Sequence, residues 1–85
     1  MYYQLWHTPS TNFMDEFSSI DEAVDVLDSA VRRDGADFLT DTHLVVFDEA
    51  GDEHLVARGE AILVAVKRIA AEERRARTAH LRKVG

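Results

Sequence analysis

The stretch that most restricts the fold is a pair of strand-like runs joined by an acidic turn. Residues 42–48, THLVVFD, and residues 53–58, EHLVAR, are rich in β-branched and apolar side chains, and EAGD separates them. Asp48 favours a type I turn at this point, and Gly51 supplies the positive φ that a bulged three-residue hairpin loop requires. The segment therefore predicts an antiparallel β-hairpin.

An amphipathic helix is predicted before this hairpin, over residues 20–34. Its apolar side chains recur at helical spacing and form one stripe, while acidic side chains occupy the opposite side. Ser19 and Glu22 stand three positions apart, as in a capping box, where each side chain accepts a hydrogen bond from an otherwise unpaired backbone amide. Gly35 follows where the left-handed residue that ends a helix belongs.

A second helix is expected to begin near Glu60, directly after Gly59 interrupts the hairpin. Its apolar stripe ends at Ala71, yet strong helix-forming residues continue to the end of the sequence. We therefore expect a compact α+β domain over residues 1–71 and a basic continuation of the C-terminal helix over residues 72–85.

The aromatic-rich run at the start, YYQLWHT, predicts a first strand over residues 2–8. Pro9 cannot donate to a β-ladder, so we expect a loop from there to Phe17. The element order is then β-α-β-β-α. It predicts a two-layer α+β sandwich, in which two helices cover one face of a three-stranded sheet and a right-handed crossover makes the first strand parallel to the second.

Composition limits both the compartment and the chemistry. The 85 residues include no cysteine, which excludes a disulfide framework and thiolate metal ligands. The longest apolar run, AILVAV, is too short to cross a bilayer, and the first residues lack the basic region that begins a secretion signal. We expect a cytoplasmic domain without a membrane segment.

No arrangement of residues indicates catalysis, a cofactor or a metal. The serines lie outside any nucleophile elbow, and the four glycines are too far apart to cradle a phosphate. His43 and His54 lie on the two arms of the hairpin, but no histidine or carboxylate pair has the spacing of a metal motif. We therefore predict no catalytic, cofactor-binding or metal-binding residue and a protein that is not an enzyme.

The net charge of −6 is divided unevenly along the chain. Residues 1–66 hold fourteen acidic side chains and three arginines, whereas residues 67–85 hold seven lysines or arginines and two glutamates. Five basic side chains near the C-terminus are candidates for contact with a polyanion or an acidic partner: Arg74, Arg75, Arg77, Arg82 and Lys83. A nucleic-acid-associated regulator is thus one alternative, disfavoured because the acidic remainder would repel a polyanion. A second alternative is an acidic inhibitor that mimics nucleic-acid charge.

The predicted function rests on the two apolar faces of the hairpin. If Leu44, Val46, Leu55 and Ala57 face the helices, the other face of the sheet is also apolar, although water should make it polar. The side chains expected on that uncovered face, and proposed as partner-binding, are Trp6, Val45, Phe47 and Val56. An apolar patch of this kind typically marks an interface. The sequence therefore predicts a protein–protein interaction module that forms a homodimer or binds a protein partner.

Overall fold

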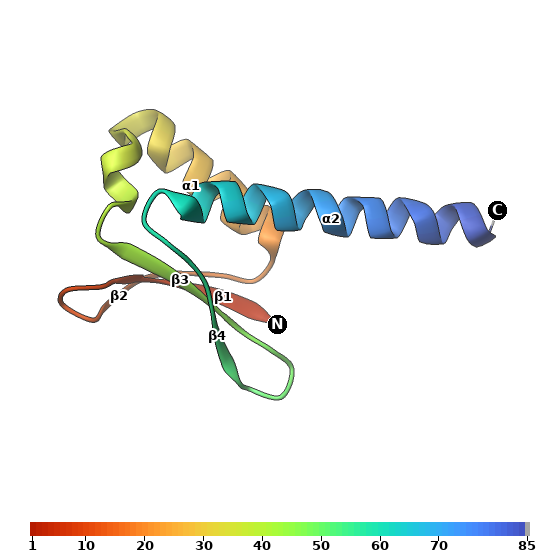
Figure 1. Cartoon of the computed structure of the whole chain (residues 1–85), viewed down its shortest axis with the longest axis horizontal. Helices are drawn as coiled ribbons and strands as arrows, with labels where there is room; N and C mark the ends of the chain where they lie inside the picture. Colours follow the sequence, from red (N-terminus) through yellow and green to blue (C-terminus); the bar gives the residue numbers. More distant parts are fainter. Residues whose placement is uncertain (85) are drawn as a thin grey trace.

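The computed structural model describes the backbone of residues 1–84 and the side chains of residues 1–78. Its elements, in chain order, are β1 (Tyr2–His7), β2 (Asn12–Phe17), α1 (Ile20–Asp34), the 3₁₀ helix η1 (Ala36–Leu39), β3 (Thr42–Phe47), β4 (Glu53–Arg58) and α2 (Ala61–Val84). Both α-helices lie on the same side of the sheet (Figure 1). The α+β class and the two-layer arrangement are confirmed, whereas the predicted number of strands is wrong, because the sheet has four.

The additional strand is β2, in the segment expected to be a loop. It pairs with β1 in an antiparallel hairpin whose turn is made by residues 8–11, and Thr11 closes that turn with a φ of 56°. The strand places Phe17 beside Tyr3, where its ring is fully buried at 0% exposure. Burial of a phenylalanine ring offsets the poor strand propensity of the neighbouring acidic residues.

The strand order is β2-β1-β3-β4, and every neighbouring pair is antiparallel. The expectation that the first strand runs parallel to the next one after α1 is therefore wrong. The β1–β2 hairpin reverses the chain before α1 begins, so the strands that α1 connects are β2 and β3. These two run parallel to each other, with β1 between them, as a helical crossover requires.

A single core lies between the sheet and the helices. It is built from Tyr3 and Leu5 of β1, Leu44 of β3 and Phe17, with one stripe from each helix. The helical members are Ile20, Ala23 and Leu27 of α1 and Ile62, Val66 and Ala70 of α2. The core therefore uses one face of each strand and leaves the opposite face of the sheet without a covering layer (Figure 1).

Both ends of α1 match the predicted bounds, but one hydrogen bond of the predicted capping box has a different partner. The hydroxyl of Ser19 accepts a hydrogen bond from the backbone amide of Glu22 at 3.1 Å, as expected of the N-cap. The carboxylate of Glu22, however, binds Ser18, accepting from its backbone amide at 3.0 Å and from its hydroxyl at 2.6 Å. These bonds lower the pKa of Glu22. Gly35 ends the helix with a φ of 87°.

Ion pairs join α1 and α2, which run antiparallel. Lys67 lies 3.1 Å from Asp28. Arg77 lies 3.9 Å from Asp21, closer to the N-terminal end of α1 and to the C-terminal end of α2. Beyond the last core contacts α2 projects away from the body (Figure 1), and the side chains of residues 72–78 are all exposed. No helix among the described residues is both long enough and apolar enough to cross a membrane.

Candidate interaction surface

The sheet face opposite the helices, called the open face below, is the main candidate for a binding surface. Its members follow from the register of the strands: Tyr2, Gln4 and Trp6 of β1, Phe13 and Glu16 of β2, His43, Val45 and Phe47 of β3, and Glu53, Leu55 and Arg58 of β4. These side chains form three rows across the sheet, because residues paired in the register stand side by side.

Trp6, Val45 and Phe47, which the sequence predicts on the uncovered face, all lie on the open face. The placement of Val56 on that face is wrong. A bulge in β4 leaves Val56 without a partner, since Leu44 pairs with Ala57 while the next residue, Val45, pairs with Leu55. Val56 packs against the core instead.

The same bulge turns Leu55 outward. Simple alternation along β4 would direct Leu55 and Ala57 to the same side, and only Ala57 packs against the core. An extra residue shifts the alternation of a strand by one, so the side chains before the bulge exchange faces. Leu55 consequently lies beside Val45 on the open face and is 52% exposed.

Aromatic rings cover two corners of the open face. The rings of Tyr2 and Phe47 stack with their centroids 4.8 Å apart and their planes 12° from parallel. Trp6 and Phe13 pack at 5.5 Å with their rings tilted by 35°. Such pairs fix the ring positions before any partner arrives, which reduces the entropy that binding would cost.

A chain of hydrogen bonds crosses the face between these aromatic pairs. The indole N–H of Trp6 donates to Oε1 of Gln4 at 3.2 Å, and Nε2 of Gln4 donates to Oε1 of Glu16 at 2.9 Å. The amide of Gln4 thus has both of its ends occupied. These hydrogen bonds hold the indole of Trp6 in one orientation. They also fix the carboxylate of Glu16 at the β2 margin of the open face.

The centre of the open face is apolar and closely packed. Val45 lies in the middle row and is only 5% exposed, although no helix or loop covers it. Its neighbours in the rows on each side, Trp6 and Phe47 among them, enclose it. Leu55, Tyr2 and Phe13 remain substantially exposed around this centre. The result is a firm apolar surface, which is uncommon on the solvent side of an antiparallel sheet.

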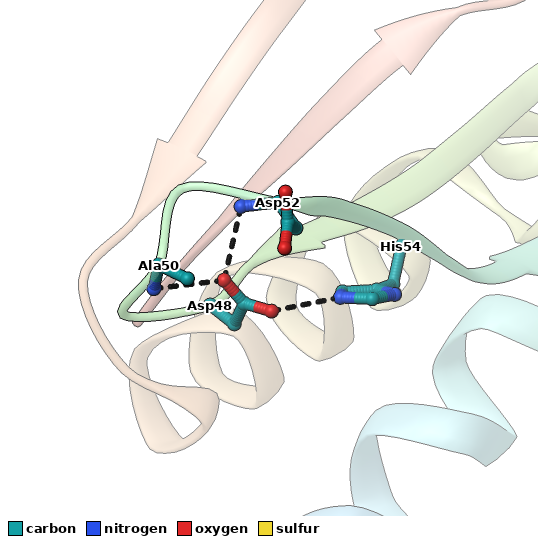
Figure 2. Close-up of polar contacts among 4 residues, drawn as sticks. All are labelled: Asp48, Ala50, Asp52 and His54. Carbon is teal, nitrogen blue, oxygen red and sulfur yellow. Dashed lines mark hydrogen bonds and ion pairs between the residues drawn. The ribbon is translucent and has the colours of Figure 1, made fainter.

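The hairpin turn beyond the open face is held by Asp48, as Figure 2 shows. Its Oδ1 accepts hydrogen bonds from the backbone amides of Ala50 and Asp52, each at 2.9 Å, and its Oδ2 lies 2.9 Å from Nε2 of His54. These interactions, that with His54 first, lower the pKa of Asp48. Gly51 has a φ of 87°, so the predicted three-residue loop is confirmed.

The two hairpin histidines do not form a common site. His43 belongs to the open face, where its Nδ1 lies 2.8 Å from the hydroxyl of Thr8. His54 pairs with Val46, whose side chain packs on the core side. The bulge in β4 therefore places His54 on the face of the sheet opposite to His43. Within residues 1–78, no group of three histidines and carboxylates is placed to hold a metal ion.

The basic residues of α2 are divided between described and undescribed positions. Arg74, Arg75 and Arg77 are exposed on the projecting part of the helix, and Arg77 faces Asp21. Arg82 and Lys83 lie outside the described side chains. Among these three, Arg77 stands beside the acidic side of α1, and Arg74 donates to the backbone carbonyl of Ala70 at 3.3 Å.

The acidic side of α1 is partly occupied by the chain's own groups. Asp28 is close to two cations, 3.0 Å from Arg32 and 3.1 Å from Lys67. Glu22 is bound to Ser18. The two cations beside Asp28 reduce the negative charge of α1 at that position, whereas the bonds from Ser18 keep the Glu22 carboxylate charged.

A second apolar area lies on the helix layer, away from the open face. Val64 of α2 is 68% exposed and lies in a shallow depression with Ala61, Ala65 and Val56. No aromatic side chain lines this depression. It supplies a useful control position, because Val64 is apolar and exposed like Leu55 but belongs to a different surface.

The sequence did not predict Leu55 and Phe13 as members of the open face. Phe13 was assigned to a loop, and Leu55 to the buried side. Only the turn-like TPST before residue 12, followed by aromatic side chains at both ends of NFMDEF, could have indicated the hairpin partner of β1.

Comparisons with models of protein families, with curated proteins and with solved structures find no match to this chain.

Proposed function

We propose that this chain is a non-enzymatic protein-interaction module that docks another protein surface on its open face. The observation that carries the proposal is the exposure of an ordered apolar surface where a sheet face in contact with water is normally polar. Aromatic residues are typical of the central part of interfaces, and the open face holds four of them, Tyr2, Trp6, Phe13 and Phe47.

The arrangement of the charged groups supports the same proposal. Glu16, Glu53 and Arg58 stand on the outer strands of the sheet, whereas the two central strands contribute aromatic, aliphatic and amide side chains and the imidazole of His43. A central apolar region with charges at its margin is the usual layout of a protein interface. The margin keeps its hydration while the centre is covered.

The proposal is tested by crosslinking in the native host. A tagged wild-type chain is compared with Leu55→Glu, which places a charge in the open face, and with Val64→Glu, which places the same charge on the helix layer. We expect the wild type and Val64→Glu to carry the same crosslinked protein, either a second copy or another chain, and Leu55→Glu to lose it.

Two results would contradict the proposal. One is an equal yield of the crosslinked protein with Leu55→Glu and with the wild type. The other is a wild type that carries no crosslinked protein at all. Circular dichroism of the purified variants confirms that each one is folded, which both substitutions allow because Leu55 and Val64 are exposed.

A further inference from the structure

The open face has a positive charge at one end of β4 and a negative charge at the other. Arg58 and Glu53 lie on the same face, at opposite ends of the strand, and Leu55 stands between them. Both charged residues are exposed, and within residues 1–78 neither has an ion-pair partner. One surface thus presents both halves of a possible ion pair, about five residues apart.

We infer that the protein docked on the open face is a second copy of this chain. The two sheets stack face to face about a two-fold axis that lies in the interface and crosses the strands at right angles. This inference rests on the proposed function, since it names the occupant of the same surface and its orientation. Two-fold symmetric pairs are the commonest protein assemblies, and each copy contributes the same patch.

The row structure of the open face selects this axis. A rotation about the middle row brings the Trp6 row of one copy over the Tyr2 row of the other. Arg58 of each copy then stands opposite Glu53 of the second copy, so two identical ion pairs form at the margin. The axis row consists of Glu16, Gln4, Val45 and Leu55, and each meets its own counterpart. Val45 and Leu55 thereby join the apolar centres, while the two Glu16 carboxylates meet at the outer margin.

The other axis for face-to-face stacking, parallel to the strands, is unfavourable. It would exchange the two outer strands and place Glu16 of β2 opposite Leu55 of the second copy. A carboxylate covered by an aliphatic side chain loses hydration without gaining a partner. The parallel axis would also place Arg58 opposite Phe13, so that neither Arg58–Glu53 pair could form. With the perpendicular axis, Glu16 faces Glu16 of the second copy at the exposed outer margin of β2, where it keeps its hydrogen bond from Gln4. The two Arg58–Glu53 pairs offset this one like-charge contact.

The size of the face implies a weak dimer. Four strands about 4.8 Å apart and six residues at about 3.3 Å each give a flat area of roughly 400 Å² per copy. Two copies together therefore cover roughly 800 Å², below the range of about 1,200–2,000 Å² that stable interfaces bury. We expect a dimer that forms reversibly, with a dissociation constant on the order of micromolar or higher.

The test is a charge exchange across the interface, measured by sedimentation equilibrium from about 10 μM to about 1 mM. Arg58→Glu and Glu53→Arg each turn both marginal pairs from attraction into repulsion, so each should weaken dimerisation about tenfold. The double variant restores opposite charges in exchanged positions. Its dissociation constant should return to within about threefold of the wild type.

Trp6, the only tryptophan of the chain, gives a second measurement on the same samples. It lies in the interface, so its emission should shift to shorter wavelength and its quenching by acrylamide should fall as the dimer forms. The single charge variants should show this change only at higher concentration. Added salt should raise the dissociation constant of the wild type, because marginal charges are screened.

The outcomes separate this inference from the proposed function. The inference is overturned if the wild type stays monomeric at about 1 mM, if the single variants dimerise like the wild type, or if the double variant fails to recover. If Leu55→Glu abolishes dimerisation while the charge exchanges have no effect, the proposed function stands and only the orientation is wrong. If Leu55→Glu dimerises like the wild type, the open face is not the dimer interface and the inference fails. The proposed function is then decided by the crosslinking of the wild type against Leu55→Glu.

Discussion

Replacing Phe17 by alanine should destabilise the protein far more than the same replacement at Phe13, although both belong to β2. Phe17 is fully buried against the core, so its removal should cost about 3–5 kcal/mol through lost burial and the cavity that remains. Phe13 is 46% exposed, and half of a ring area of about 200 Å² at about 25 cal/mol/Å² sets an upper limit of roughly 2.5 kcal/mol on the cost of removing it, with no buried cavity to add.

The contrast is large compared with the stability of a domain this small. At about 0.05–0.15 kcal/mol per residue, the whole chain has on the order of 4–13 kcal/mol of unfolding free energy. Phe17→Ala therefore removes about a quarter or more of it and brings a weakly stable domain close to unfolding. Phe17→Leu, which retains a large apolar side chain, should remain folded and provide a measurable intermediate value.

The measurement is urea unfolding followed by circular dichroism at low micromolar concentration, where self-association does not contribute. The midpoint should fall in the order wild type, Phe13→Ala, Phe17→Leu, Phe17→Ala. If Phe17→Ala costs less than about 1 kcal/mol, or no more than Phe13→Ala, then β2 does not place Phe17 in the core. The four-stranded sheet and the open face built on it would then be wrong.

Three further changes test local features. Thr11→Gly should stabilise the fold by about 0.5 kcal/mol, because a β-branched residue at a φ of 56° is strained; a lower thermal midpoint would contradict this. The lowered pKa of Asp48 means that its charge stabilises the fold above about pH 4 and that this contribution is lost as the pH falls through the folded-state pKa. The advantage of the wild type over Asp48→Asn in urea should therefore shrink between about pH 6 and about pH 3, and a constant difference would refute the assignment. Arg77→Gln should change the unfolding free energy by less than about 0.5 kcal/mol, because its contact with Asp21 is long and exposed; a loss above about 1 kcal/mol in the same titration would show that the contact between α1 and α2 depends on it.

Local signals in the sequence were sufficient for the elements whose ends are marked by special residues. Ser19 and Gly35 fix the two ends of α1, and Gly51 fixes the loop between β3 and β4. Each of these positions depends on a contact within a few residues or on a conformation that glycine favours. None of the three positions depends on the rest of the fold.

The failures lie where one additional residue changes the pattern. Met14 is the extra residue of β2 and Val56 that of β4, and each interrupts the alternation by which a strand is recognised. A bulge is defined by the partner strand, so its position is not encoded in the composition of the bulged strand itself. The bulge in β4 is why Leu55 and Val56 were placed on exchanged faces, whereas Pro9 led to the prediction of a loop in place of β2.

The positions of these two bulges have a consequence for how the protein can aggregate. They occur in β2 and β4, which are the two outer strands of the sheet. A straight outer strand can recruit another chain edge to edge and propagate into a fibre, and a bulge disrupts the regular row of amides and carbonyls that such growth needs. Each margin of the sheet is thereby a poor template, while the apolar face remains available. If two copies stack as proposed, association stops at two copies and does not continue into an open-ended polymer.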